Sequence, residues 1–143
     1  MQRKVVGALV VALMVVVEAC GGSGSTPLTT AQLRAQASAV CRDVTRQIQA
    51  LAASARPSTR QASLRQAATA MTDGLARLRA LTPPKALADR YASFVAWKGS
   101  QRDAARQLAE PGGRLTARAA EAVNAHRSPA FALARALGID GCV

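Results

Sequence analysis

The chain is 143 residues long, which leaves room for one domain and excludes a large multidomain enzyme. Half of its residues are hydrophobic but only 3% are aromatic, and this composition favours helices that pack through small side chains. The formal net charge of +11 favours anionic partners, although an ordinary solvated surface rich in Arg explains the same number.

The amino-terminal residues have the pattern of a targeting segment. Arg3 and Lys4 provide a positive start, and an apolar run follows from Val5 to Val17. A run of this length is typical of a signal peptide, whereas a membrane-spanning helix needs about 20 apolar residues. A transmembrane anchor is therefore the weaker interpretation, and residues 1–19 are predicted to be a removable signal peptide.

The end of this segment resembles a lipobox, the processing site of bacterial lipoproteins. Val17, Ala19 and Cys20 match its pattern, and Glu18 departs from it. The resemblance implies a diacylglyceryl group on the Cys20 thiol, with acyl chains such as palmitate that hold the protein on the outer face of the cell membrane. An ordinary secretory signal with a chance cysteine is the alternative. Residues 20–28 include a Gly/Ser-rich stretch and are expected to form a flexible tether.

Residues 29–143 are predicted to form one helical domain. Thr29 and Gln32 have the spacing of a capping box, and Leu28 and Leu33 have that of a hydrophobic staple. The first helix should therefore start here. Its predicted apolar face consists of Leu33, Ala37, Val40, Val44, Ile48 and Leu51, with Cys41 beside it.

The second helix is expected to start after Pro57, where Ser58 is the predicted cap and Gln61 completes a second capping box. Gly74 weakens this helix by about 1 kcal/mol relative to Ala and allows close contact with a neighbouring helix. The proline pair at 83–84 ends the helix. Its predicted apolar stripe consists of Leu64, Ala68, Met71, Leu75 and Leu78.

Three further helices are predicted in the remaining sequence. The third runs from about Lys85 to Ala109, and the fourth from about Arg114 to His126. A short terminal helix starts at Ser128–Pro129 and ends at Leu137, with Gly138 as its C′ residue. The predicted fold is all-α, a four-helix antiparallel bundle with a short extra C-terminal helix.

Cys41 and Cys142 are an even pair in a chain that is expected to be exported, where disulfides persist. A structural disulfide is the predicted role, and a redox pair or a metal site is the alternative. A bridge would close a loop of about 100 residues, worth up to roughly 4.7 kcal/mol on the chain-entropy model.

Three segments resemble a group of small actinobacterial lipoproteins that have no assigned activity. They are Ala37–Cys41, Leu78–Pro84 and Ala134–Cys142, the last with the pattern Leu-Gly-Ile-x-x-Cys. The resemblance implies a secreted helical bundle with a bridge between Cys41 and Cys142. It implies no activity.

Residue types that support catalysis are scarce. His126 is the single histidine and is expected to be a solvated residue at a helix end. No two acids of the mature chain are three or four residues apart, so no helix presents a carboxylate pair. No phosphate loop, nucleophile elbow or zinc spacing occurs. We therefore expect neither an enzyme nor a bound cofactor or metal.

Lys98, Arg102 and Arg106 follow one another at intervals of one helical turn and are predicted to form a basic ridge. Removing residues 1–19 takes away two cations and one anion, which leaves a net charge of +10. The leading hypothesis is a non-catalytic envelope protein, binding or structural, that contacts anionic lipid or wall polymer. Nucleic acid is not an expected partner, because the protein is expected to be exported and no aromatic residues alternate with the arginines. Ordinary surface charge is the alternative, favoured by the ion-pair spacings Asp43–Arg46, Asp73–Arg77 and Asp103–Arg106.

The second hypothesis is a carrier of a small apolar ligand. Ala-rich helices with few large side chains leave room for a cavity, expected near Tyr91, Phe94 and Trp97. Trp97 is one residue past the apolar stripe of its helix, so a half-exposed packing role is the expected one for this residue.

Overall fold

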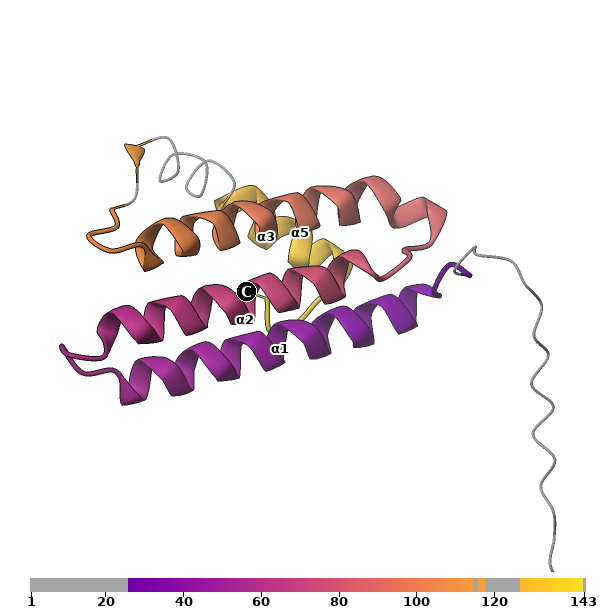
Figure 1. The fold of residues 1–143 in the computed structure, drawn as a ribbon. Helices are drawn as coiled ribbons and strands as arrows, with labels where there is room; N and C mark the ends of the chain where they lie inside the picture. Colours follow the sequence, from indigo (N-terminus) through magenta and orange to yellow (C-terminus); the bar gives the residue numbers. More distant parts are fainter. Residues whose placement is uncertain (1–25, 115, 118–126, 143) are drawn as a thin grey trace, which may run out of the picture.

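The computed structural model describes residues 26–114, 116–117 and 127–142, and every regular element in them is helical (Figure 1). The predicted all-α class is confirmed. None of the described helices has the length and apolar character that crossing a membrane requires. The elements are α1 (Thr30–Ser54), α2 (Arg60–Arg79), the short 3-10 helix η1 (Lys85–Leu87), α3 (Ala88–Ala109) and α5 (Arg127–Leu137).

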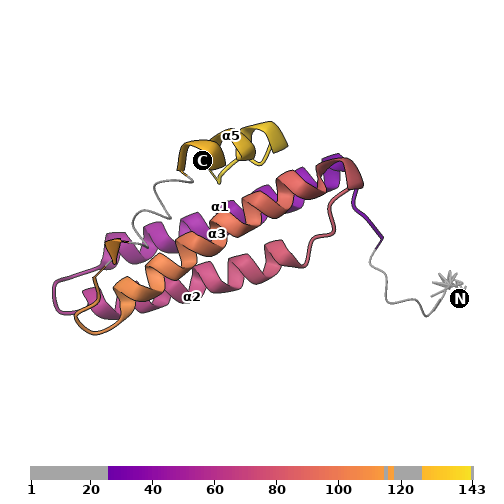
Figure 2. The same ribbon diagram turned by 90° about the horizontal axis from the view of Figure 1, so that it is seen from above.

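The helices form a bundle in which α2 packs against both α1 and α3. Figure 2 shows α5 on the side of α1 and α3 that is opposite to α2. Because α5 is the shortest of the α-helices, it covers only part of the length of its neighbours (Figures 1 and 2). The fourth helix predicted over residues 114–126 falls mostly outside the described residues.

The start of α1 follows the local sequence. Thr29 is the N-cap, its hydroxyl accepts from the Gln32 amide, and the Gln32 side chain accepts from the Thr29 amide. The predicted capping box is therefore confirmed. Leu28 packs against the core to which Leu33 belongs, and its amide donates to the carbonyl of Thr82 at 2.9 Å.

The predicted N-cap of α2, Ser58, is wrong by one residue, and the predicted capping box with Gln61 does not form. Thr59 is the N-cap, and neither it nor Ser58 caps the helix through its side chain. Gln61 instead donates from Nε2 to the carbonyls of Ala109 and Glu110 at the end of α3. The physical reason is tertiary: this amide satisfies carbonyls that α3 leaves free at its end, which a local pattern does not reveal.

The core is centred on the aromatic side chains of α3. The hydroxyl of Tyr91 donates to the Leu78 carbonyl at 2.8 Å, and burial raises the pKa of Tyr91. Trp97 is 3% exposed, so the expectation of a half-exposed tryptophan is wrong. The ring of Phe131 on α5 lies edge-on to the Trp97 ring, with 5.9 Å between centroids. The sequence pattern of α3 alone predicts that this side of Trp97 is open to solvent, because it does not show where α5 packs. The core cluster consists of Leu33, Ala37, Cys41, Leu78, Tyr91, Phe94, Trp97, Ala134, Leu137, Ile139 and Cys142.

The end of α5 has the predicted glycine cap. Gly138 adopts a φ of 67°, its amide donates to Arg135, and the amide of Ile139 donates to Ala134. These two bonds define a Schellman motif, with Ile139 buried as its hydrophobic residue. The chain therefore leaves α5 in a direction that leads back to α1.

The carboxyl-terminal segment, from Leu137 to Cys142, is attached to α1 by several contacts. Arg34 donates from Nε to the Leu137 carbonyl at 2.9 Å, and the Asp140 amide donates to the Ser38 hydroxyl at 3.0 Å. Cys41 and Cys142 then lie at disulfide distance, with their Cα atoms 5.1 Å apart. The predicted proximity of the two cysteines is confirmed, and their covalent bond stays a prediction.

Substitution of Gly74 by Ala is expected to destabilise the protein. A Cβ atom at this buried position would overlap Cγ2 of Val44 on α1, and the β-branched valine has little freedom to move. We expect a loss of about 1–2 kcal/mol in the free energy of unfolding, because overpacking exceeds the gain of about 1 kcal/mol in helix propensity. Urea unfolding measures this loss.

Gly99 on α3 provides the matched control. It is also buried within a helix, but a Cβ atom there meets its nearest neighbours at 3.9 Å, which is ordinary contact. Gly99→Ala should therefore leave the stability unchanged or raise it by up to about 1 kcal/mol. Equal effects of the two substitutions would contradict the close approach of α1 and α2.

Candidate functional site

A cavity of about 260 Å³ lies between α1, α2 and α3. Its lining is mostly aliphatic, and Lys98 is the one lining residue that has a charged side chain. The volume is slightly below the usual range for ligand pockets, which indicates a small ligand. We call this cavity the Lys98 pocket; its lining consists of Val40, Cys41, Val44, Thr45, Ile48, Met71, Gly74, Leu75, Leu78, Lys98 and Gln101.

The pocket lies next to the attachment of the carboxyl-terminal segment to α1. Cys41, which faces Cys142, belongs to the lining. Thr45 belongs to it as well, and its hydroxyl donates to the Gly141 carbonyl at 3.4 Å. Gly141 itself needs its φ of 81° to make this turn. The carboxyl-terminal segment therefore contacts two lining residues of the pocket but is not itself part of the lining.

Lys98 is half-buried, and its environment is apolar. Its Nζ lies 4.5 Å from the centroid of the Trp97 ring and 5.9 Å from that of Phe94, both within the range of a cation–π interaction. No carboxylate of the described residues is within ion-pair distance of this nitrogen. Burial lowers the pKa of Lys98 to about 8, because the charged form has lost part of its hydration.

The three cations of the predicted ridge have different surroundings. Lys98 lines the pocket, Arg102 has a side chain that is only 17% exposed, and Arg106 is exposed. The Nε atom of Arg102 lies 2.6 Å from Oδ1 of Asp103. The ridge therefore does not present three free cations to solvent. Its contact with anionic lipid or wall polymer stays a prediction.

The cavity is not where the sequence placed it. Tyr91, Phe94 and Trp97 lie in the packed core with their rings tilted against one another, and successive ring centroids are 6.0 and 6.2 Å apart. Lys98, the next residue after Trp97, has its side chain in the pocket. No signal in the sequence distinguishes Lys98 from an ordinary surface lysine.

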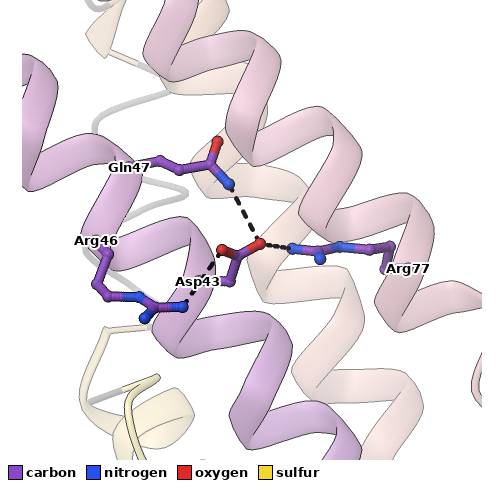
Figure 3. Close-up of polar contacts among 4 residues, drawn as sticks. All are labelled: Asp43, Arg46, Gln47 and Arg77. Carbon is purple, nitrogen blue, oxygen red and sulfur yellow. Dashed lines mark hydrogen bonds and ion pairs between the residues drawn. The ribbon is translucent and has the colours of Figure 1, made fainter.

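A polar cluster joins α1 and α2 near the pocket (Figure 3). Asp43 accepts from Arg77 across the helix interface at 2.6 Å, and from Gln47 at 3.2 Å, while Arg46 lies 3.6 Å from its second oxygen. The hydrogen bond from Arg77 is the main reason that the pKa of Asp43 is lowered. Arg77 thus pairs with another helix rather than with Asp73, and such solvent-exposed pairs contribute little to stability.

A second groove, of about 570 Å³, lies between α1 and α2 and is more open to solvent. Its lining includes two charged residues, Arg65 and Asp73. We regard the Lys98 pocket as the better candidate, because it combines partial enclosure with a charged group in an apolar setting.

Other predicted site residues are less informative. Cys20 and His126 lie outside the described residues. In the part of the chain that the structure describes, no three His, Cys, Asp or Glu side chains are grouped as metal ligands. The alternative of a metal site at Cys41 and Cys142 therefore has no third ligand among those residues.

No protein-family model, curated protein or solved structure matches this chain. The resemblance to small actinobacterial lipoproteins stays a prediction. A functional assignment therefore depends on the chemistry of the pocket and on the amino-terminal pattern.

Substitution of Lys98 by Met is expected to change how stability depends on pH. The folded protein holds Lys98 at a pKa of about 8, below the ordinary value of 10.5, so between these pH values the unfolded chain binds the additional proton. Raising the pH from 7 to 10.5 should therefore stabilise the wild-type protein relative to Lys98→Met by on the order of 2 kcal/mol. Urea unfolding of both proteins at the two pH values measures the difference.

The control is Lys85→Met, which removes an exposed lysine outside the pocket. It should keep the wild-type pH dependence. If Lys98→Met also keeps it, the ammonium group of Lys98 is as well hydrated in the folded protein as in the unfolded chain.

Proposed function

We propose that this protein is a lipid-anchored component of the cell envelope with a non-catalytic binding role, and that its helical domain holds a small apolar ligand in the Lys98 pocket. The observation that carries the proposal is the partly enclosed aliphatic cavity between α1, α2 and α3. Transfer of an apolar ligand group from water into such a cavity is favourable.

The amino-terminal pattern supports the anchor. A positive start, an apolar run and a lipobox-like ending precede Cys20, and a Gly/Ser-rich stretch follows it. The first described contact of the domain is made by Leu28, the last residue of the predicted tether. Acylation at Cys20 would thus leave the bundle free to extend from the outer face of the membrane.

The finer architecture belongs to the same proposal. We propose an antiparallel four-helix bundle in which residues 114–126 form the fourth helix and α5 is the short extra one. The apolar spacing of Leu115, Ala119, Ala122 and Val123 supports this helix. A catalytic role has no comparable support, because the sequence lacks carboxylates paired on one helix and has no recognisable catalytic motif.

Contact with anionic lipid or wall polymer is the second candidate function. A mature charge of +10 supports it through long-range attraction, which is screened by salt. Lys98 belongs both to the predicted basic ridge and to the lining of the pocket, so the two candidate functions share this residue.

Substitution of Cys20 by Ser is expected to release the protein from the membrane. In a bacterial host that processes lipoproteins, the wild-type protein should incorporate labelled palmitate and sediment with membranes, and the variant should do neither. Envelope association of the variant that a high-salt wash removes would support the second candidate. A wild-type protein that retains Met1 and carries no acyl group would disprove the anchor.

The neutral probe 1-octanol is expected to bind in the pocket. Trp97 is the only tryptophan and packs under Lys98, so its fluorescence reports on the site. In the full chain carrying Cys20→Ser, which has no acyl group to compete, octanol should produce a saturable change in Trp97 emission. Ile48→Phe should weaken binding roughly tenfold, because the larger side chain occupies part of the cavity.

Leu51→Phe is the matched control for this experiment. Leu51 is half-buried on α1 one turn after Ile48, but it lines the open groove and not the pocket. It should bind octanol as the wild-type protein does. The same affinity for octanol in both variants would place the probe elsewhere, and no saturable change at all would end the proposal for the pocket.

A further inference from the structure

We infer that the ligand of the Lys98 pocket is a small amphiphilic anion, with a carboxylate-type head group bound by the ammonium of Lys98 and a short apolar tail between α1 and α2. The inference rests on the proposed function of the pocket and specifies the chemical class of its ligand. It depends on three features: a cation with no anionic partner among the described residues, an aliphatic wall and the direction in which they are arranged.

The cation lacks an anionic partner among the described residues. Buried charges in proteins are normally paired, because an unpaired charge that has lost hydration is costly. Asp43 and Asp103 are engaged by Arg77 and Arg102. The rings of Trp97 and Phe94 offset part of the cost of Lys98, but they accept none of the strong hydrogen bonds that its three N–H donors can make.

The opposite wall of the pocket is aliphatic. Val44 and Ile48 on α1 face Met71 and Leu75 on α2, and none of these side chains has a polar group to offer. A head group alone, such as inorganic phosphate, would leave this wall without a partner. A tail on the ligand would bury it, at about 25 cal/mol for each Å² of apolar surface.

The arrangement gives the ligand a direction. Lys98 and Gln101 are three residues apart on α3, so their side chains lie on the same face of that helix. An ammonium and an amide N–H can therefore bind the oxygens of one carboxylate, with the tail pointing to α1 and α2. A volume of about 260 Å³ is small for a ligand pocket, which fits a short tail such as that of octanoate.

The test compares three ligands that share one tail: octanoate, 1-octanol and octylamine. Titrations of the full chain carrying Cys20→Ser at pH 7, followed by Trp97 fluorescence, give their affinities. Octanoate should bind roughly tenfold to a hundredfold more tightly than octanol, which is the range for a charge-assisted hydrogen bond. Octylamine should bind more weakly than octanol, because it places a second cation beside Lys98.

Substitution at Lys98 identifies the group responsible. Lys98→Met should bind octanoate no better than octanol, while its affinity for octanol is kept or improved. Lys85→Met removes the same charge from an exposed position outside the pocket and should retain the wild-type preference. This control separates binding by Lys98 from general attraction of an anion to a basic protein.

The outcomes separate this inference from the proposed function. Equal affinities of the wild-type protein for octanoate and octanol would overturn the inference and leave an apolar pocket in place. A preference for octanoate that persists in Lys98→Met would also overturn it. Failure of all three ligands to bind would remove the proposed function of the pocket as well. Should Lys98→Met not fold, the comparison of ligands in the wild-type protein decides alone.

Discussion

The attachment of the carboxyl-terminal segment to α1 is the constraint on which the rest of the structure depends. Arg34 and Ser38 bind its backbone, and Cys41 lies at disulfide distance from Cys142. These contacts hold α5 against α3, where Phe131 packs on Trp97 and where Ala134 and Leu137 join the core. Along α1 they meet the Lys98 pocket, because Cys41 and Thr45 both contact the carboxyl-terminal segment and line the pocket. The same part of α1 therefore anchors the end of the chain and forms a wall of the pocket.

The sequence predicts the features that depend on neighbouring residues. The capping box of Thr29 and the glycine cap at Gly138 are satisfied by partners within five residues, so their patterns identify them correctly. Gln61 shows the limit of such patterns, because its amide binds carbonyls 48 and 49 residues away instead of the cap beside it. A side chain that has both a local and a distant partner available cannot be assigned from spacing alone.

The sequence predicts a cavity between the helices but places it wrongly, because its position also depends on residues that are distant in the sequence. Lys98, Arg102 and Arg106 look equivalent in the sequence, yet four-residue steps advance about 40° beyond each full turn of a helix with 3.6 residues per turn. The three side chains therefore rotate from the pocket, through a largely buried position, to solvent. Which of them faces inward is decided by where α1 and α2 lie, and that information is not local to α3.

The charge of Lys98 links the stability of the folded protein to the presence of an anionic ligand in the pocket. With no anion present, desolvation disfavours the charged form of Lys98 and lowers its pKa, so part of the folding free energy is lost in holding it. An anionic ligand would reverse this effect, because a nearby negative charge favours the protonated amine and raises its pKa again. Binding would then stabilise the bundle by more than the burial of the tail alone provides. The desolvation cost of the Lys98 charge, which has no anionic partner among the described residues, is the source of selectivity for an anionic ligand. A neutral ligand of the same shape leaves this cost in place.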